Sequence, residues 1–387
     1  MSGGEVLALV GARIHTGRVV LDRHAVLVRD GRIEDVVPAS ALPPDVATRA
    51  CAGCTLAPGF IDLQVNGGGD VLFGAEPTVA ALERIAAAHA RFGTTRFLPT
   101  LITGPRAAMA AACDAVRTAQ AAPSSGVLGL HFEGPFLNPA RRGVHDAGHM
   151  RAPDVADLAL ITAAGVGITL LTLAPEQVPP GFIARLVAAG VRVAAGHSDA
   201  APNVLRRALA EGLSLFTHLY NAMGQMQARE PGVVGMALAD TTAWCSVIAD
   251  GHHVHDAALA VAWRAKAAGK LLLVSDAMPP VGGTVPHFVL DGRTIAMRNG
   301  RCVTADGVLA GSAIGLSAAV RHCVRQVGVP LDEALRMAST YVAEFLGRDD
   351  IGRIVPGARA DLVALDAALD VAATWRDGML VYDAGQP

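Results

Sequence analysis

Four polar side chains in this sequence stand at the ends of short apolar runs and have the types that metal-assisted hydrolysis requires. Glu133 ends the run VLGLHFE, His197 and His218 end two later runs, and Asp276 ends a fourth. Two imidazoles and one carboxylate form the ligand set of a catalytic zinc-type site that keeps one position open for water. A divalent cation lowers the pKa of a bound water toward neutrality, so the sequence predicts hydrolytic chemistry at neutral pH.

Asp276 has the chemistry of an acid/base group. A carboxylate beside the attacking water can accept its proton and deliver it to a departing nitrogen, which contributes roughly 10²- to 10⁴-fold to the rate. Two other interpretations stay open at this point. Asp276 could be a fourth metal ligand, and Glu133 and the two histidines could be unrelated polar residues at strand ends.

The elements that must position these residues follow a repeating pattern. Eight strand-like runs alternate with Ala-rich segments of helical period, as in the βα units of a parallel sheet. Eight strands close an α/β barrel of the (β/α)8 TIM type, whose active site lies at the carboxyl ends of its strands. A doubly wound sheet is the alternative. The predicted strands cover residues 60–65, 95–99, 127–133, 167–173, 192–197, 213–218, 244–250 and 271–276.

Helical segments are predicted at residues 79–92, 106–119, 182–189 and 202–211, where apolar residues return every three or four positions. After the eighth predicted strand, residues 279–309 are rich in Gly and Pro and contain a predicted hairpin between residues 289–295 and 301–304. We interpret this segment as a lid-like insertion at the barrel mouth, because loops at that face line active sites. Two helices, at residues 313–327 and 331–346, are predicted to follow.

Both ends of the chain read as strands. Residues 5–55 and 356–382 alternate apolar and polar residues, and Asp30-Gly31 between two such runs is a hairpin signal. We therefore predict a small β-sandwich domain built from residues 1–57 and 348–387. The catalytic barrel is predicted to span residues 58–347, which agrees with the length of about 250 residues typical of such barrels.

Composition favours a small-molecule partner. The net charge is −3 with 32 basic residues and no basic block, which argues against nucleic acid or an anionic membrane as the main partner. No apolar run approaches the about 20 residues of a membrane helix.

Cysteine usage and the N-terminus predict a cytoplasmic protein. Six cysteines in 387 residues do not make a disulfide framework and suggest buried thiols in a reducing compartment. Cys51 and Cys54 form a C-x-x-C pair, but no second pair lies at the spacing of a zinc ribbon. The first five residues, MSGGE, have no positive flank and no continuous apolar stretch, so no secretory signal is predicted.

Seven motifs, in order along the chain, together resemble the N-acetylglucosamine-6-phosphate deacetylase family of the amidohydrolase superfamily. The resemblance extends from about residue 6 to residue 366. The motifs are PGFIDLQVNG at 58–67, HFEGPF at 131–136, GHS at 196–198, THLYNAM at 217–223, IADG at 248–251, VSDA at 274–277 and LAGS at 309–312. The activity that the resemblance implies is metal-dependent removal of the acetyl group from N-acetyl-D-glucosamine 6-phosphate, which gives D-glucosamine 6-phosphate and acetate.

The resemblance implies catalytic roles at five positions. Glu133, His197 and His218 match the family's metal ligands, and Asp276 matches its catalytic acid/base. His145 matches a catalytic residue that contacts the substrate near the scissile carbonyl. The expected cofactor is one divalent metal ion per subunit, most readily zinc, although the ligand set also accepts iron, manganese or cobalt.

Further matches imply how the amino-sugar phosphate is bound. A homodimer is expected, in which Arg229 reaches the phosphate across the interface, and a guanidinium fork suits a phosphate. Taken alone, Arg229 could also be a solvated charge on the loop 225–230. His252 and His255, beside a matching position, stay unassigned. The substrate-binding matches are Val144, His145, Asn221, Ala222, Arg229, His253, Leu309, Ala310 and Gly311.

One departure from the wider superfamily concerns the number of metals. Many members carry His-x-His on the first strand for another metal, whereas this sequence has Gln64 and Asn66 there. Amide side chains are poor zinc ligands beside imidazole, so Gln64 and Asn66 mark a possible vacant second-metal position. A single tightly bound metal is therefore predicted.

Three alternative functions remain at this level. A deacetylase of N-acetylgalactosamine 6-phosphate needs the same chemistry with one hydroxyl inverted. A cyclic amidase or aminoacylase of the superfamily would usually need His-x-His on the first strand and has no evident use for Arg229. A barrel without catalytic activity would give no function to the four polar residues at the strand ends.

Overall fold

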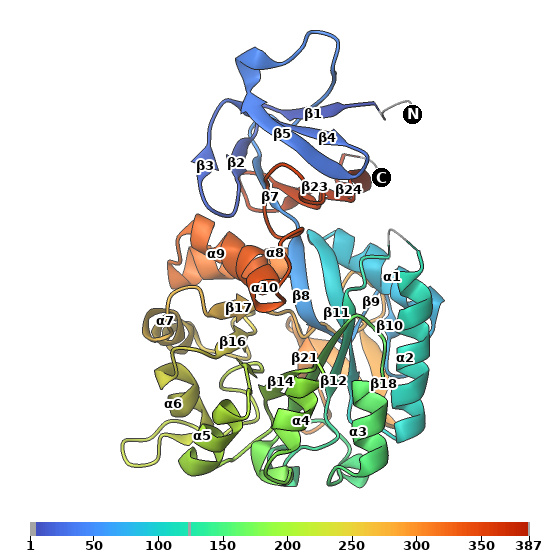
Figure 1. Cartoon of the computed structure of the whole chain (residues 1–387), viewed down its shortest axis with the longest axis vertical. Helices are drawn as coiled ribbons and strands as arrows, with labels where there is room; N and C mark the ends of the chain where they lie inside the picture. The colour runs from blue at the N-terminus through green and yellow to red at the C-terminus, as the bar shows by residue number, and fades with distance from the viewer. Residues whose placement is uncertain (1–4, 123–124, 386–387) are drawn as a thin grey trace.

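A small β domain and a larger barrel lie one above the other along the long axis of the molecule (Figure 1). The computed structural model describes residues 5–122 and 125–385. Residues 1–4, on which most of the expectation about a secretory signal rests, lie outside this range. Within the described part of the chain, no helix is both long enough and apolar enough to cross a bilayer.

The barrel contains eight parallel strands whose spatial order follows their order in the sequence. The ring closes where Val65 and Ala277 form a parallel bridge and the N–H of Asn66 donates to the carbonyl of Ala277 at 3.0 Å. This order confirms the predicted TIM-type barrel and excludes the doubly wound sheet. The strands are β8 (Phe60–Val65), β11 (Thr94–Ile102), β12 (Gly129–Glu133), β13 (Ile168–Leu173), β14 (Arg192–Ala195), β15 (Leu215–Phe216), β16 (Trp244–Val247) and β17 (Leu271–Leu273).

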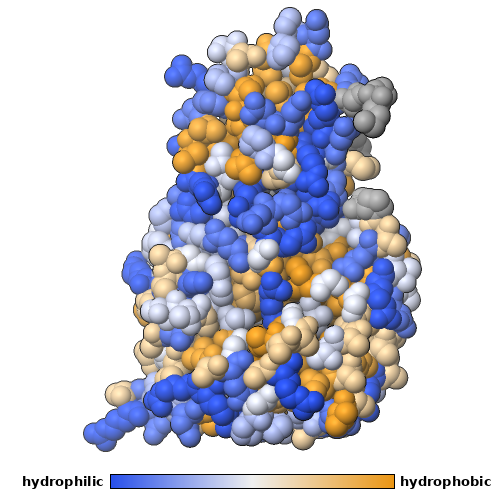
Figure 2. Space-filling model, in the orientation of Figure 1, coloured by the Kyte–Doolittle hydropathy of each residue, from blue (hydrophilic) through white to orange (hydrophobic). Residues whose placement is uncertain are grey.

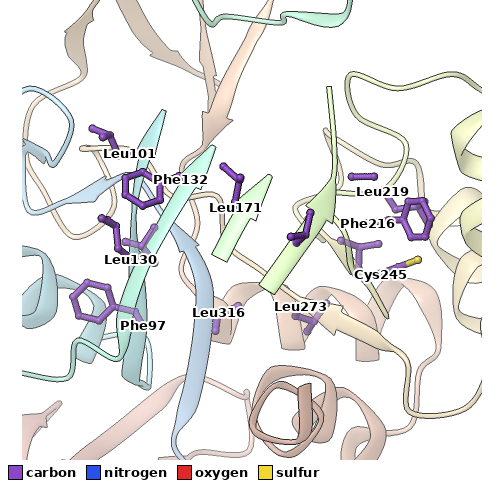
Figure 3. Packing of buried hydrophobic residues seen from close by; sticks show 14 of the residues in the cluster. Phe97, Leu101, Leu130, Phe132, Leu171, Phe216, Leu219, Cys245, Leu273 and Leu316 are labelled. Carbon is purple, nitrogen blue, oxygen red and sulfur yellow. The ribbon is translucent and has the colours of Figure 1, made fainter. Parts of the chain in front are cut away.

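Helices cover the outside of the barrel, and most of them pack an apolar face against the strands. The main core lies between helices and strands, and Figure 3 shows several of its side chains, such as Phe97, Leu130 and Leu171, spread along neighbouring strands. The hydroxyl of Thr78 caps the first helix by accepting from the N–H of Ala81 at 3.2 Å. The helices are α1 (Val79–Ala90), α2 (Arg106–Gln120), α3 (Val155–Thr162), α4 (Phe182–Ala188), α5 (Pro202–Ala210), α6 (Gly232–Ala239), α7 (Asp256–Ala265) and α8 (Leu316–His322).

The two predicted C-terminal helices are present over nearly the predicted ranges, but each is interrupted. The first is α8 followed by a π-helical turn at Cys323–Val327, and the second is broken into α9 (Leu331–Ala338) and α10 (Thr340–Phe345). The break lies at Ser339, which has φ −142° and ψ −79° and donates its hydroxyl proton to the carbonyl of Leu335 at 2.6 Å. Such a side-chain bond competes with helix continuation, and the turn of the chain lets α10 pack against the inner core of the barrel.

The predicted hairpin of the insertion is part of a larger sheet. Its four antiparallel strands are β18 (His287–Leu290), β19 (Arg293–Arg298), β20 (Arg301–Val303) and β21 (Leu309–Ser312). A small cluster with Met278, Phe288 and Leu290 packs beneath them. A bridge between Ala277 and Ser312 joins the sheet to the end of the barrel. The short strands β9 (Gly67–Gly68) and β10 (Val71–Leu72) form a hairpin after β8.

Both ends of the chain build the β-sandwich, as predicted. One sheet has the order β5-β4-β1-β6, and the other has the order β24-β23-β22-β7-β2-β3, in which the C-terminal strands pair with β7. Trp375, Ile14 and Leu56 are buried in the core of this domain. The strands are β1 (Leu7–Val10), β2 (Arg13–His15), β3 (Val20–Leu21), β4 (His24–Arg29), β5 (Arg32–Pro38), β6 (Ala47–Ala50), β7 (Thr55–Pro58), β22 (Leu362–Leu365), β23 (Val371–Arg376) and β24 (Met379–Asp383).

A buried ion pair joins the two domains. Figure 2 shows hydrophilic residues gathered on this face over the junction. Beneath the surface, Arg96 of β11 pairs with Asp361 at 2.6 Å and with Asp377 at 2.7 Å. Two carboxylates compensate the buried guanidinium, which would otherwise be costly to desolvate. We propose that the domain boundaries are those predicted, with residues 1–57 and 348–387 in the small domain and residues 58–347 in the barrel.

Gly31 offers a test of the sandwich turn. Asp30 and Gly31 have φ of 49° and 76°, and a Cβ on Gly31 would lie 3.0 Å from the carbonyl oxygen of Asp377. Gly31→Ala is therefore expected to lower the free energy of unfolding by more than the about 1–2 kcal/mol that the left-handed backbone alone costs, measured by urea denaturation. Gly292→Ala is the control, because Gly292 has φ 75° in an equivalent turn with no atom within 4 Å. Equal losses in both variants would contradict a role for the Asp377 contact.

Candidate active site

Glu133, His197 and His218 meet at the carboxyl end of the barrel. Glu133 ends β12, and the histidines stand two residues beyond β14 and β15. Glu133 Oε1 lies 3.2 Å from His197 Nε2 and 2.9 Å from His218 Nε2, and the two Nε2 atoms are 3.2 Å apart. All three side chains are buried, and their nearest polar atoms lie within 4.8 Å of one another. The group could therefore hold a metal ion.

The hydrogen bonds around these residues fit a cation. His197 Nδ1 lies 2.9 Å from the carbonyl oxygen of Arg141, which can only accept, so this nitrogen carries the proton. In a neutral ring, His197 Nε2 then presents a lone pair toward the carboxylate of Glu133. Two acceptors facing each other in a buried site need a positive charge between them, and this tautomer is the one that ligates metals. The donor set present therefore fits a divalent metal.

The groups around Glu133 set its charge. Burial alone would raise the pKa of this carboxyl, but the close imidazoles of His197 and His218, with His145 nearby, hold the pKa well below its usual value. Gln64 Nε2 donates a hydrogen bond to Glu133 Oε1 at 3.1 Å. Glu133 is consequently an anion, as a metal ligand must be.

Asp276 lies on the neighbouring side of the same site. Burial, followed by the charge of Glu133, raises the pKa of Asp276 to about 7, although His218, His253 and a hydrogen bond from Asn66 partly oppose this shift. Asn66 Nδ2 donates to Asp276 Oδ1 at 2.7 Å. A carboxyl with a pKa near neutrality can both accept and return a proton, as an acid/base group requires.

Gln64 and Asn66 act here as hydrogen-bond donors. Their amide groups contact Glu133 and Asp276, whereas their oxygen atoms, Gln64 Oε1 and Asn66 Oδ1, are buried without a partner among the residues that the structure describes. The amide N–H groups thus use one carboxylate oxygen of Glu133 and one of Asp276 for hydrogen bonds. The single metal expected from the sequence stays a prediction.

Three of the residues proposed for metal binding or acid/base chemistry have an unfavourable backbone conformation. His197, His218 and Asp276 have φ of 48°, 35° and 50°, in the left-handed region that glycine prefers. Such a conformation costs about 1–3 kcal/mol for a single residue and persists only where the surrounding structure enforces it. The chain turns sharply after each strand and thereby directs each side chain into the barrel mouth.

His145 completes the polar wall. Burial, together with the neighbouring His197, lowers the pKa of His145 to about 3, so the ring is neutral. Its Nδ1 accepts from the N–H of Thr103 at 3.4 Å and lies 2.9 Å from the Thr103 hydroxyl. The proton is therefore on Nε2, which lies 3.8 Å from Glu133 Oε2 and can donate toward the site.

A cavity of about 500 Å³ opens above these groups. The insertion forms one wall through Leu290, Val308 and Leu309, which agrees with its predicted position at the barrel mouth. Arg293 of the insertion also donates to the carbonyl of Val144. The cavity thus has the size of a small-molecule site. Of the residues predicted to contact substrate, Val144, His145, Asn221, Ala222, His253, Leu309 and Gly311 line it.

Two predicted substrate-binding residues do not line the cavity with their side chains, although Ala310 was expected to contribute only its backbone. The side chain of Ala310 is buried among Met278, Phe288 and Ile295 beneath the insertion, so only its backbone could face a ligand. Arg229 is exposed on the loop 225–230, which does not line the cavity and projects away from the barrel before α6 (Figure 1). In one chain alone, Arg229 is therefore not part of the site.

His253 is held by a carboxylate that the sequence analysis did not assign. His253 Nδ1 lies 2.7 Å from Asp250 Oδ2. Burial alone would lower the pKa of His253, but the hydrogen bond and charge of Asp250 raise it. A protonated or strongly polarised imidazole at this wall suits a ligand oxygen. The spacing of three residues between Asp250 and His253 was the available sequence signal.

Other supporting residues were also missed. Thr103 orients His145, and the carbonyl of Arg141 fixes the tautomer of His197. No sequence signal identifies either, because one is a lone hydroxyl and the other a backbone atom. Ile102 and Met278, which line the cavity with apolar side chains, looked like ordinary core residues.

Comparisons with known proteins agree with this geometry. Residues 55–382 match the amidohydrolase family and residues 6–56 match the NagA composite domain. An N-acetylgalactosamine-6-phosphate deacetylase of Shewanella sp. (strain ANA-3) is 40% identical over 97% of this chain and 96% of that protein. An N-acetylglucosamine-6-phosphate deacetylase of Haemophilus influenzae is 34% identical over 96% of this chain and 98% of that protein.

A solved structure is also closely similar. The crystal structure of N-acetylglucosamine-6-phosphate deacetylase from Pasteurella multocida has a TM-score of 0.94 and 35% identity, and the match covers 97% of this chain and 99% of that one. These findings confirm the resemblance predicted from the motifs. Because the family match extends over the whole barrel that carries the site, the chain belongs to the amidohydrolase family.

Proposed function

We propose that this protein hydrolyses the acetamide of N-acetyl-D-glucosamine 6-phosphate to D-glucosamine 6-phosphate and acetate, with the help of a bound divalent metal. The observation that carries this proposal is the convergence of Glu133, His197 and His218 with Asp276 at one cavity. The names of similar proteins, all deacetylases of N-acetyl-hexosamine 6-phosphates among those described above, support the substrate class.

Glu133, His197 and His218 would hold one metal ion per subunit. When bound, such an ion polarises the scissile carbonyl and makes an attacking water more acidic. Zinc is the metal that this donor set suits best, and iron, manganese and cobalt share its preferences.

Asp276 and His145 would carry out the remaining chemistry. Asp276 accepts a proton from the attacking water as the water oxygen bonds to the carbonyl carbon. The same carboxyl then gives that proton to the nitrogen as the C–N bond breaks, which leaves acetate and the free amine. His145 Nε2–H donates to the carbonyl oxygen and stabilises the negative charge that develops there.

The sugar would lie against the polar wall of the cavity. Asn221 and His253 offer side-chain donors, and the small residues Ala222 and Gly311 let a ring approach the backbone. The phosphate would be bound by Arg229 of a second copy in a homodimer, since the exposed loop 225–230 projects from its own barrel (Figure 1). The free cysteines support the proposed cytoplasmic location, because thiols stay reduced there.

N-acetyl-D-galactosamine 6-phosphate is a second candidate substrate. It is favoured by one observation, the 40% identity to a protein named for that activity. The two sugars differ in the orientation of one hydroxyl, and both present the same acetamide to Asp276.

Acetate release from a panel of amino sugars tests the proposed function. The panel contains N-acetyl-glucosamine and N-acetyl-galactosamine, each with and without the 6-phosphate, and the metal content is measured by mass spectrometry. We expect kcat/KM to be highest for N-acetyl-glucosamine 6-phosphate. A higher value for the galactosamine epimer would favour the second candidate. Equal rates without the phosphate would leave only the amidohydrolase assignment.

Removing the phosphate contact has a defined effect. Arg229→Ala is expected to lower kcat/KM for the 6-phosphate substrate by about 10- to 100-fold, because a charge-assisted hydrogen bond contributes about 1.5–3 kcal/mol. Arg91→Ala, which removes another exposed arginine, is the control and is expected to change nothing. Steady-state kinetics and sedimentation provide the readouts. A monomeric protein with an unaffected Arg229→Ala variant would overturn both the dimer and the phosphate role.

A further inference from the structure

A second, smaller chamber of about 130 Å³ adjoins the active-site cavity beside the ends of β8 and β11. Four residues line both spaces and so form the partition between them, namely Asn66, Ile102, Met278 and Leu290. Ile102 is the register partner of Glu133 on the adjacent strand, so the partition lies directly beside the predicted metal ligand. Thr103, which orients His145, also lines this chamber, but no step described above places a ligand group in it.

The walls of the chamber are mainly apolar. Besides the partition, Leu72, Ala75, Leu101, Pro105, Ala108 and Val289 line it. Polar side chains also contribute, namely Asn66, Thr100, Thr103, His149 and Asp291. An apolar chamber of this kind favours an alkyl group, since burial of each methylene group contributes about 0.8 kcal/mol.

The position of the chamber identifies which part of a substrate would point into it. Asn66 contacts Asp276 at 2.7 Å, so the chamber begins beside the proposed acid/base. The proposed sugar contacts Asn221 and His253 follow β15 and β16, on the other side of β17 and Asp276. Besides its oxygen, the carbonyl carbon of an amide carries the nitrogen on one side and the alkyl part of the acyl chain on the other. If the sugar nitrogen lies toward Asn221, the acyl chain lies toward the partition.

We propose that this chamber is an acyl subsite and that the protein also hydrolyses amides whose N-acyl group is longer than acetyl. This inference rests on the proposed function. A water-sized group occupies about 30 Å³, so 130 Å³ admits the additional methylene groups of a propionyl or butyryl chain. Met278 is the movable part of the partition, because an unbranched thioether side chain changes its rotamer at little cost. The reaction stays the same, and the product acid becomes propionate or butyrate.

The test compares N-acetyl-, N-propionyl- and N-butyryl-glucosamine 6-phosphate as substrates of the holoenzyme. We expect kcat/KM of the parent protein for the two longer substrates to lie within about tenfold of the N-acetyl value. Ala108→Leu places a larger side chain in the chamber from α2. It is expected to lower the ratio of kcat/KM for N-butyryl over N-acetyl by at least about tenfold, since two methylene groups lose their burial.

Ala107→Leu is the matched control. Ala107 is the preceding residue of the same helix and is exposed, and Ala and Leu have similar helix propensity. This variant is expected to leave the acyl-chain profile unchanged. Turnover of the N-acetyl substrate alone, or an unaltered ratio in Ala108→Leu, would refute the subsite and leave the proposed function intact. A uniform loss for all three substrates leaves this ratio unaltered and would likewise refute the subsite. Absence of turnover on all three would refute the proposed function and with it the subsite.

Discussion

Asp276→Asn is expected to lower kcat by about 10²- to 10⁴-fold while the metal content stays nearly intact. Asn keeps the size of the side chain and can still accept the hydrogen bond that Asn66 donates at 2.7 Å. It cannot take a proton from water or return one to the leaving nitrogen. Steady-state kinetics and metal analysis of the same preparation separate these effects. Unchanged turnover would remove the proposed role, whereas loss of the metal would favour Asp276 as a fourth ligand.

Asp30→Asn is the matched control for this substitution. Asp30 has φ 49°, close to the 50° of Asp276, but lies exposed in the sandwich turn. The same chemical change in the same backbone conformation should leave kcat unaltered. A comparable loss in both variants would point to a general effect on folding.

The pKa of Asp276 determines the direction of the pH effects. The general base must be ionised, so kcat/KM is expected to fall as the pH drops, and this acidic limb should disappear in Asp276→Asn.

In the metal-free protein, burial and Glu133 raise the pKa of Asp276 from 3.8 to about 7. The folded state therefore holds the proton more tightly than the unfolded chain, and stability present below about pH 4 is lost as the pH rises to about 7. Metal-free Asp276→Asn should consequently melt at a higher temperature than the metal-free parent at pH 8.

His218→Ala is expected to abolish tight metal binding and to lower kcat/KM by more than about 100-fold. Loss of a residue that merely supports a ligand costs about 10- to 100-fold, and loss of a ligand should cost more. His218 Nε2 lies within 3.2 Å of both Glu133 and His197, so its removal opens one side of the group. Metal analysis by mass spectrometry after dialysis is the direct measurement.

His252→Ala provides the comparison for His218→Ala. His252 is exposed beyond the seventh strand and has no assigned role. This variant should retain metal and activity, and circular dichroism of both variants would show whether the barrel is preserved. Full metal occupancy in a folded His218→Ala protein would contradict the assigned ligand set.

The sequence by itself determined the barrel and which polar residues meet at its mouth. Strand-like runs are short, alternate with helical periods and end in polar residues, so order along the chain predicts order around the ring. Glu133, His197, His218 and Asp276 each directly follow or end such a run. In a closed parallel barrel all carboxyl ends share one face, and local patterns therefore predicted a convergence of distant residues.

Only the tertiary structure decided how these residues are held. Asn66 and Asp276 are 210 positions apart, and nothing local indicates that an amide contacts that carboxyl. The break at Ser339 and the joining of Leu309–Ser312 to the insertion sheet depend on packing against the barrel, which helix and strand propensities do not contain. Burial and neighbouring charges set the ionisation of Asp276 and His145, because the cost of a buried charge depends on every group around it.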